Sequence, residues 1–339
     1  MRLRRLLLSA LLALAACEAS PSPPERFYVS LERGDAVVAL DPRSGKVVAR
    51  FAPGRRPRGL HLSPDGRTLF IAVSGSAIVG PGVDDDRQPL PDRRADGIAV
   101  IDLTSGKLDR VLSAGTDPES FAVSPDGRTL YVSNEDGGAV SEVAVDGTRP
   151  PKSGTVGDQP EGVAVTRDGA TLFVACEGSD WVAMLDARTM RLRRTIPVAG
   201  RPRTLLLSRD GKTVFVAAEF GGRLALLSAE TGALYAQIDL RRGDASLRPM
   251  GMVEATDRRL FVTTGRGGAV LEVDPKRHAV VGRIDGIGAR PWGIAIDRDG
   301  RLLATANGPS NDVTFVDRAS GKAVSRVVVG AGPWGIVGS

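Results

Sequence analysis

A short pattern that recurs along the chain constrains the fold more than any other feature of the sequence. It consists of Pro, one variable residue, then Gly, Ser or Thr, followed by an apolar residue, and it occurs seven times. The intervals between the prolines are 61, 42, 42, 47, 42 and 42 residues, the prolines being Pro57, Pro118, Pro160, Pro202, Pro249, Pro291 and Pro333. A period of this length, carried by strand-like segments, predicts a ring or a stack of equivalent sheets.

Each repeat is long enough for one four-stranded sheet. In the first six copies an Asp follows the Pro by eight residues, and usually a Gly comes next, as in Asp126-Gly127. Asp followed by Gly is typical of a tight turn. Apolar runs such as residues 130–133 and 324–329 lie between the turns, as expected for strands covered on both faces. Four strands in about 42 residues match one blade of a β-propeller.

The two ends of the chain complement each other. The first unit, from Phe27, has no Pro-x-Gly strand, whereas the chain ends in GPWGIVGS, which is a single strand of that kind. We therefore predict an all-β fold, with residues 27–339 forming one seven-bladed propeller whose first blade is closed by the C-terminal strand. Closure removes the exposed sheet edges. The alternative, an open β-solenoid, requires atypical caps, and the sequence shows none.

Residues 1–17 have the pattern of an export signal. Three Arg precede an apolar run at residues 6–16, which is too short for a stable membrane span, and the segment ends in LAAC. This ending resembles a bacterial lipobox and predicts lipidation of Cys17; the alternative is an ordinary signal peptide with a chance Cys. Residues 18–26 are interpreted as a Pro- and Ser-rich tether. The expected location is the bacterial cell envelope, as a periplasm-facing lipoprotein, with the outer membrane favoured because Glu18 follows the Cys.

Charge and cysteine content exclude several functions. The chain has 45 Lys and Arg against 40 Asp and Glu, but three of the Arg lie in the signal. The mature chain is nearly neutral, so no nucleic-acid partner is expected. Once Cys17 is lipidated, Cys176 has no disulfide partner and is interpreted as a small apolar residue at a strand end.

The sequence contains no motif for a haem, a catalytic zinc, a nucleophilic serine or a phosphate loop, so no cofactor is evident and no metal site is predicted. His61 is interpreted as an interior residue beside the channel.

The order of strands assigns the two faces of the ring. The Pro-x-Gly entry and the loop after the second strand of each blade share one face, which we call the rim. The extra residues of the two longer intervals, 74–96 and 241–246, both fall on the rim. Irregular loops gathered on one face usually mark a binding face.

The candidate site residues gather on the rim. The variable residue of the pattern is charged on one arc of the ring and apolar on the other, reading Arg58, Glu119, Glu161, Arg203, Met250, Trp292 and Trp334. The end of the second strand adds Glu135, Glu177 and Glu219, with Asn307 at the adjoining position. Charged and apolar side chains around the opening of the channel predict that a small anionic ligand or a loop of a partner protein binds there. Alternatively the glutamates hold a divalent ion. In a purely structural interpretation, Arg58–Glu119 and Arg203–Glu161 are exposed ion pairs that each contribute less than about 1 kcal/mol to stability. The Trp side chains then cover the ends of the blades.

Three stretches carry a resemblance to known proteins: residues 56–72 (RPRGLHLSPDGRTLFIA), 130–143 (LYVSNEDGGAVSEV) and 288–317 (GARPWGIAIDRDGRLLATANGPSNDVTFVD). The chain resembles the YVTN-type seven-bladed β-propeller repeat proteins, and among them the bacterial group associated with pyrroloquinoline-quinone-dependent alcohol catabolism. The resemblance is specific for fold and weak for chemistry. It implies an exported accessory of periplasmic quinoprotein oxidation, and it carries over no quinone-binding residue.

We therefore expect a monomeric, membrane-tethered binding module without enzymatic activity, whose partner is a periplasmic or membrane protein or a small anionic ligand. The first alternative is a lactonase-like hydrolase, because related seven-bladed propellers carry that activity. Arg203 with Glu161 or Glu219 would then polarise the carbonyl and act as general base. The second alternative is a surface-displayed scaffold that binds through the sides of its blades.

Overall fold

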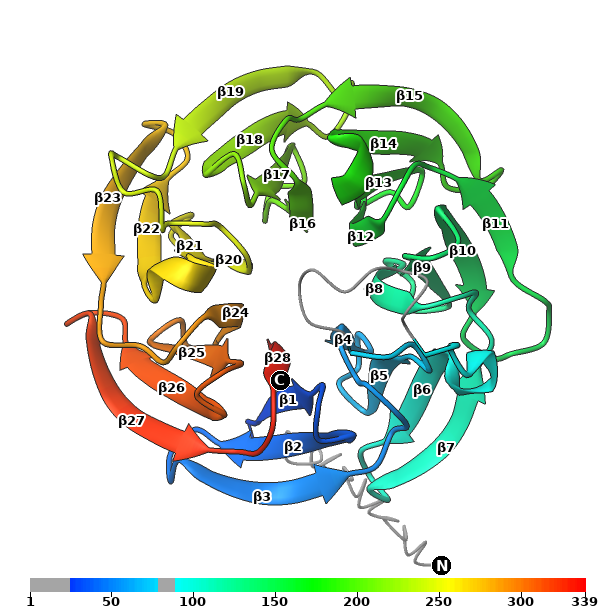
Figure 1. The fold of residues 1–339 in the computed structure, drawn as a ribbon, viewed down its shortest axis with the longest axis horizontal. Coiled ribbons are helices and arrows are strands. Elements are labelled where there is room, and N and C mark those ends of the chain that lie inside the picture. Colours follow the sequence, from blue (N-terminus) through cyan, green and yellow to red (C-terminus); the bar gives the residue numbers. More distant parts are fainter. Residues whose placement is uncertain (1–24, 79–88) are drawn as a thin grey trace, which may run out of the picture.

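The chain folds into a closed ring of seven antiparallel sheets, each of four strands, around a central channel (Figure 1). The computed structural model describes residues 25–78 and 89–339. The predicted seven-bladed propeller is thereby confirmed. Cys17, the export signal and most of the predicted tether lie outside the described residues. Within the two described ranges, no helix has the length and apolar character needed to cross a membrane.

Every blade runs from an innermost strand beside the channel to an outermost strand on the surface. The four strands of each blade are named from the innermost to the outermost. Blade 1 has β28 (Pro333–Gly338), β1 (Phe27–Leu31), β2 (Ala36–Asp41) and β3 (Lys46–Phe51); blade 2 has β4 (Leu60–Leu62), β5 (Thr68–Val73), β6 (Gly97–Asp102) and β7 (Lys107–Leu112). Blade 3 has β8 (Pro118–Val123), β9 (Thr129–Asn134), β10 (Ala139–Ala144) and β11 (Lys152–Thr155); blade 4 has β12 (Pro160–Val165), β13 (Thr171–Cys176), β14 (Trp181–Asp186) and β15 (Arg191–Pro197). Blade 5 has β16 (Pro202–Leu207), β17 (Thr213–Ala218), β18 (Arg223–Ser228) and β19 (Leu234–Asp239). Blade 6 has β20 (Met252–Glu254), β21 (Leu260–Thr263), β22 (Val270–Asp274) and β23 (Ala279–Ile284); blade 7 has β24 (Pro291–Ile296), β25 (Leu302–Asn307), β26 (Asp312–Asp317) and β27 (Lys322–Val328). In the part of the chain that the structure describes, three short 3-10 helices lie between second and third strands: η2 (Arg93–Ala95), η3 (Glu177–Ser179) and η4 (Gly265–Gly267).

The C-terminal strand closes the first blade, as predicted. β28 pairs antiparallel with β1, so that Val337 lies opposite Tyr28 and Ile336 opposite Val29. The Ser339 amide also donates to the carbonyl oxygen of Arg26 at 2.9 Å. The described part of the chain therefore begins and ends at neighbouring points of one sheet, and the ring has no open end.

The Asp-Gly turns work as their sequence predicts. Asp65 accepts hydrogen bonds from the Ser63 hydroxyl, at 2.5 Å, and from the Arg67 amide, at 3.1 Å. The next residue, Gly66, has a φ of +68°, which a residue with a side chain rarely adopts. Local side-chain bonds of this kind end the innermost strand and turn the chain into the second one.

The core lies between neighbouring blades. The second and third strands are covered on both faces, which explains their continuous apolar runs, whereas the outermost strand β3 is mostly exposed. Phe27 of blade 1 contacts Phe315 of blade 7 edge to face, with ring centroids 5.6 Å apart. Each blade contributes one Phe that is at most 2% exposed: Phe27, Phe70, Phe121, Phe173, Phe215, Phe261 and Phe315.

The Gly of the repeated pattern brings the innermost strands close together. A Cβ on Gly162 would lie 2.4 Å from the carbonyl oxygen of Arg203 in the next blade. A Cβ on Gly251 would likewise lie 2.4 Å from the carbonyl oxygen of Trp292, to which the Gly251 amide donates at 2.9 Å. Glycine therefore sets the variable residues of successive blades side by side around the channel.

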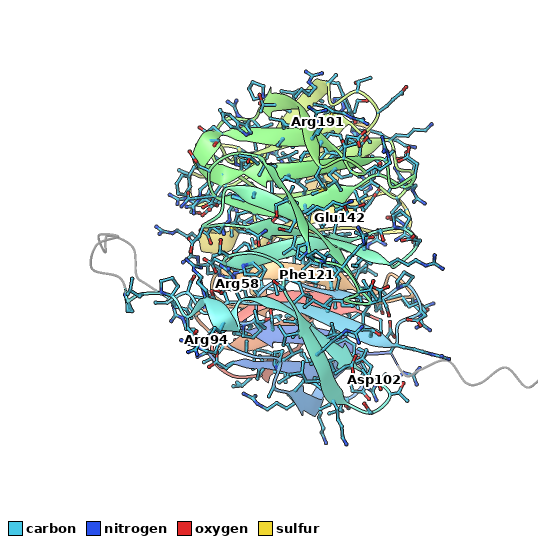
Figure 2. The ribbon with its side chains drawn as sticks, turned by 90° about the vertical axis from the view of Figure 1, so that its right-hand side faces the viewer. Arg58, Arg94, Asp102, Phe121, Glu142 and Arg191 are labelled. Atoms are coloured by element: carbon cyan, nitrogen blue, oxygen red, sulfur yellow. The ribbon has the colours of Figure 1, made fainter. Side chains whose placement is uncertain are left out.

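The described parts of the two longer connections lie on the rim, as predicted. The Ser74 hydroxyl, at the start of one, donates to Asp117 at 2.5 Å. Arg241, in the other, donates to the carbonyl oxygen of Phe220, which follows the second strand of blade 5. Seen from the side, Arg94 of the β5–β6 connection lies at the rim and Asp102, in the turn after β6, at the opposite face (Figure 2).

Candidate functional site

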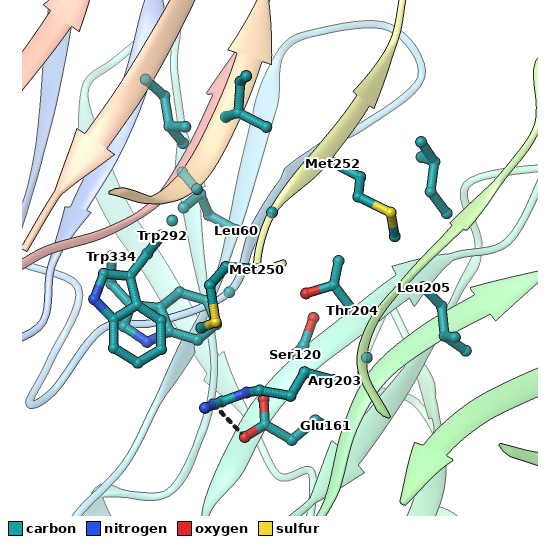
Figure 3. Close-up of a pocket in the computed structure, with 18 of the residues that line it drawn as sticks. Leu60, Ser120, Glu161, Arg203, Thr204, Leu205, Met250, Met252, Trp292 and Trp334 are labelled. Carbon is teal, nitrogen blue, oxygen red and sulfur yellow. Dashed lines mark hydrogen bonds and ion pairs between the residues drawn. The ribbon is translucent and has the colours of Figure 1, made fainter. Parts of the chain in front are cut away.

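A cavity of about 210 Å³ opens in the central channel, and the innermost strands of all seven blades line it. Most of the lining is apolar. Five of the predicted rim residues are part of it, namely Glu161, Arg203, Met250, Trp292 and Trp334 (Figure 3). The cavity has the size of a small cyclic molecule, and its few charged groups lie together at one place. We call it the channel cavity.

Arg203 is the centre of the charged group. Its Nη2 contacts Glu161 at 2.5 Å, its Nη1 contacts Glu219 at 3.3 Å, and its Nε lies 3.3 Å from Glu177. Arg201 adds a second guanidinium, 2.5 Å from Glu177. We call these five residues the Arg203 cluster. The sequence brings it together because Arg203 begins one innermost strand while the glutamates begin or follow strands of the same two blades.

The Arg203 cluster holds three carboxyl groups against two guanidinium groups, and the pKa values respond to this imbalance. Burial raises the pKa of Glu161 well above its ordinary value, and Glu177 and Glu135 add to the rise, although Arg203 opposes it. Burial acts in the same direction on Glu177, but Arg203, Arg201 and a hydrogen bond with Glu161 lower its pKa overall. The pKa values of Glu161 and Glu177 are thus shifted in opposite directions, although Arg203 contacts both carboxyl groups.

A pair of indoles forms the apolar side of the site. Trp292 and Trp334 stack with ring centroids 6.1 Å apart and an interplanar angle of 26°. The Arg203 guanidinium lies 5.2 Å from the centroid of Trp292, within the range of a cation–π contact. Figure 3 shows both rings beside Met250 and close to the Arg203–Glu161 pair. The two Trp of the predicted apolar arc thus lie next to the predicted charged arc.

Arg58 and Glu119 do not line the channel cavity. Arg58 is 1% exposed, pairs with Glu119, contacts Asp117 at 2.5 Å and donates to the carbonyl oxygen of Pro118 at 2.8 Å. Glu135 lies 3.4 Å from the same guanidinium. The prediction of an exposed mouth was wrong here, as it was for Arg203, which is only 7% exposed. The physical reason is the close approach of the innermost strands, which encloses these side chains between blades.

Asn307 does not reach the channel cavity either. It is fully buried, and its amide donates to Asp312 at 2.6 Å and to the Thr314 hydroxyl at 3.0 Å, both within blade 7. The reason is strand alternation: Asn307 is the last residue of β25, one position before the rim residue of its blade.

The two other groups that the sequence singled out have local roles. His61 lines the channel cavity, and its ring centroid lies 5.0 Å from that of Phe121. Burial lowers the pKa of His61 to about 4, although a backbone hydrogen bond at Phe121 raises it, so the imidazole is neutral. Cys176 ends β13 and is buried, and burial raises the pKa of its thiol to about 12. Among the residues described, no three His, Cys, Asp or Glu side chains are placed to share a metal ion.

The residue before each Pro of the pattern was not among the predicted site residues. This residue has a positive φ in Arg56, Asp117, Gln159, Arg201 and Arg290. A left-handed conformation before Pro is unusual for a residue with a side chain. It turns the chain into the innermost strand and leaves the side chain on the rim. The signal was in the repeat itself, because Arg stands at this place in blades 2, 5, 6 and 7.

The fold is a seven-bladed propeller with a buried acid–arginine cluster and two stacked indoles at its channel. Over residues 46–161 the chain matches the family model described as lactonase, 7-bladed beta-propeller. The matched segment ends at Glu161 and does not include Arg203. No curated protein sequence matches the chain significantly.

Solved structures share the fold at low sequence identity. Hydrazine synthase of Kuenenia stuttgartiensis matches at 19% identity and a TM-score of 0.73, covering 91% of this chain and 99% of that one. A putative 6-phosphogluconolactonase of Bacteroides fragilis matches at 16% identity and a TM-score of 0.73, covering 95% of this chain and 100% of that one. The periplasmic gluconolactonase of Pseudomonas aeruginosa matches at 23% identity and a TM-score of 0.72, covering 92% of this chain and 98% of that one. The comparisons support the propeller, and they give no support to the pyrroloquinoline-quinone-associated group.

Proposed function

We propose that the chain is a hydrolase that opens the ring of a lactone in the channel cavity. One observation carries the proposal: Glu161, a buried carboxyl group with a raised pKa, contacts Arg203 at the polar end of an otherwise apolar cavity. The match to the lactonase family model over residues 46–161 supports the same reaction. This was the alternative prediction, and the comparisons favour it over a binding module for quinoprotein oxidation.

Glu161 is the proposed proton carrier. In its ionised form it takes a proton from a water molecule while the water oxygen attacks the carbonyl carbon of the lactone. The same proton passes to the ring oxygen when the carbon–oxygen bond breaks, and the product is a hydroxy acid. A pKa raised by burial makes the ionised Glu161 a stronger base than an exposed glutamate, which favours proton transfer from water.

Arg203 is the proposed group that stabilises the oxyanion formed by the attack. A guanidinium has five N–H donors in one plane, and the contacts with Glu161, Glu177 and Glu219 occupy one on each nitrogen. The second N–H of Nη1 and of Nη2 is left for the substrate oxygen. Because three carboxyl groups hold Arg203 in place, the donors are oriented before the substrate arrives, which is the condition for electrostatic catalysis.

The apolar lining holds the rest of the substrate. The indole faces of Trp292 and Trp334 suit the ring of a small lactone, as apolar and aromatic walls do in most small-molecule sites. The volume of about 210 Å³ limits the ligand to a single small ring with short substituents.

The test is hydrolysis of a panel of five- and six-membered lactones, with and without added divalent metal, followed by acid release. We expect turnover above the spontaneous rate, and Glu161→Gln should reduce kcat by about a hundredfold or more. Glu142→Gln is the matched control, because Glu142 is equally buried and pairs with Arg149 at 2.7 Å but lies in blade 3 away from the cavity. Unchanged turnover in Glu161→Gln, or no turnover with any lactone, would contradict the proposal.

Export and anchoring are part of the proposal and rest on the sequence alone. The signal-like residues 1–17 and the LAAC ending suggest lipidation of Cys17, which would hold the propeller at the periplasmic side of a membrane. Cys17→Ala should then move the protein from the membrane to the soluble fraction after cell lysis, with lactone turnover unchanged.

A further inference from the structure

The rim beside blades 6 and 7 carries three arginines that the Arg203 cluster does not include. Arg248 and Arg290 are half-buried, and Arg266 is exposed. Among residues 25–78 and 89–339, none of the three forms an ion pair with a carboxylate, although the neighbouring Arg201 forms two. We call Arg248, Arg266 and Arg290 the rim arginines.

The register of the repeat explains why these charges have no acidic counterpart. Seventeen residues after the Pro, blades 3 to 5 carry a Glu, whereas blade 6 carries Arg266. Arg248 and Arg290 stand directly before Pro249 and Pro291. These rim positions therefore include acids in blades 3 to 5, whereas in blades 6 and 7 the charged residues at them are all arginines.

Aromatic rings hold two of the rim arginines in place. The Arg290 guanidinium lies 4.6 Å from the centroid of Trp292, and that of Arg248 lies 5.0 Å from the centroid of Phe220. Phe220 is 48% exposed, and Arg201 approaches the same ring at 4.9 Å. Stacking uses the face of a guanidinium, so its in-plane N–H groups stay available for a ligand.

The electrostatics of this arc call for an anion. Burial lowers the pKa of Arg290; Glu219 opposes this, and the positive charges of Arg266, Arg203 and Arg201 lower it further. Arg266, Arg203 and Arg201 are thus close enough to act on Arg290, and a surface on which cations outnumber carboxylates attracts oxyanions from solution. Guanidinium groups bind carboxylate and phosphate oxygens with paired, charge-assisted hydrogen bonds.

We propose that the rim arginines form a binding site for an oxyanion, the carboxylate or phosphate group of a small ligand at the mouth of the channel cavity. Arg290 and Arg203 contact the same Trp292 ring, so a group bound at the rim lies next to the Arg203 cluster. The identification of this ligand with an anionic lactone or its hydroxy-acid product rests on the proposed function. The binding of the anion itself does not.

Calorimetric titration of the full chain tests the site at low ionic strength, because salt screens exposed charges. The probes are inorganic phosphate, glucose 6-phosphate, gluconate and, as the neutral reference, glucose. We expect the anions to bind and glucose not to bind; a preference for glucose 6-phosphate identifies a phosphate site, and one for gluconate a carboxylate site. Arg266→Ala and Arg290→Ala should each raise Kd about tenfold.

Two controls keep the result interpretable. Arg191→Ala removes an exposed arginine of the outermost strand β15 and should leave Kd unchanged. Arg266 is exposed, so its variant tests the site even if Arg290→Ala unfolds because it uncovers Trp292. The proposal is overturned if no anion binds more tightly than glucose, or if Arg191→Ala weakens binding as much as Arg266→Ala does. Anion binding without any lactone turnover would uphold the rim site and reject the hydrolase.

Discussion

The guanidinium of Arg58 is enclosed by Asp117, Glu119 and the carbonyl oxygen of Pro118, with 1% of the residue exposed. Removing one member of a buried ion-pair group leaves the others charged and without a partner, which typically costs about 3–5 kcal/mol. Arg58→Ala should therefore lower the free energy of unfolding in urea by about 3–5 kcal/mol. The exposed Arg191→Ala should change it by less than about 0.5 kcal/mol. A loss below about 1 kcal/mol for Arg58→Ala would mean that the group behaves like an exposed surface pair.

Glu161 gives a second prediction at the scale of the residue, because its pKa rises on folding. Above the ordinary value of 4.5 the unfolded chain loses the Glu161 proton, whereas the folded protein keeps it until the raised pKa is reached. Over that interval the folded state binds more protons, so this group lowers stability as pH rises. In Glu161→Gln the side chain is neutral at every pH. The stability of the variant relative to the wild type should therefore increase from about pH 4.5 upward until the folded pKa is reached.

Urea unfolding at several pH values measures this difference. Glu142→Gln again serves as the control, since it makes the same change in a buried Glu outside the Arg203 cluster. A difference between Glu161→Gln and the wild type that stays constant with pH, or declines, would show that folding does not raise the pKa of Glu161.

At the scale of the element, contacts between innermost strands couple stability to the geometry of the site. β12 and β16 approach closely at Gly162, where a Cβ would meet the backbone carbonyl of Arg203 at 2.4 Å. A backbone atom cannot rotate away, so Gly162→Ala should lower stability by about 1–3 kcal/mol. It should also separate Glu161 from Arg203 and thereby reduce lactone turnover. Thr204→Ala is the matched control, because Thr204 holds the same place in the next blade and already carries a Cβ. Equal thermal midpoints for the two variants would contradict this account.

At the scale of the whole molecule, the sequence was sufficient for the ring but not for the depth of the site. The period of the pattern and the unfinished last unit predicted seven blades and their closure, because turn chemistry and strand patterning are local properties. Burial of Arg58 and Arg203 depends instead on how closely neighbouring blades approach, which no single repeat reveals. The rim arginines escaped prediction for a related reason. Their significance is that none of them forms an ion pair within the described residues, and this appears only when the neighbouring blades are placed side by side.

Closure of the ring is the property on which the rim, the channel cavity and the Arg203 cluster all depend. Deleting residues 333–339 removes β28, leaves the edge of β1 unpaired and takes Trp334 from the cavity. An exposed strand edge pairs readily with another chain. The shortened protein should therefore either lose cooperative unfolding or associate, as measured by thermal melting and by size-exclusion chromatography with light scattering.

A circular permutant separates the loss of β28 from the loss of chain continuity. Because the Ser339 amide donates to the carbonyl oxygen of Arg26, a short Gly linker can join Ser339 to Glu25, with new termini between Val329 and Gly330. This permutant keeps every described strand and places β28 directly before β1 in the sequence. It should melt at the wild-type temperature and stay in the wild-type oligomeric state, whereas the deletion variant should not. If the deletion variant kept both properties, β28 would be dispensable and the toroid would not need the pairing of its first and last strands.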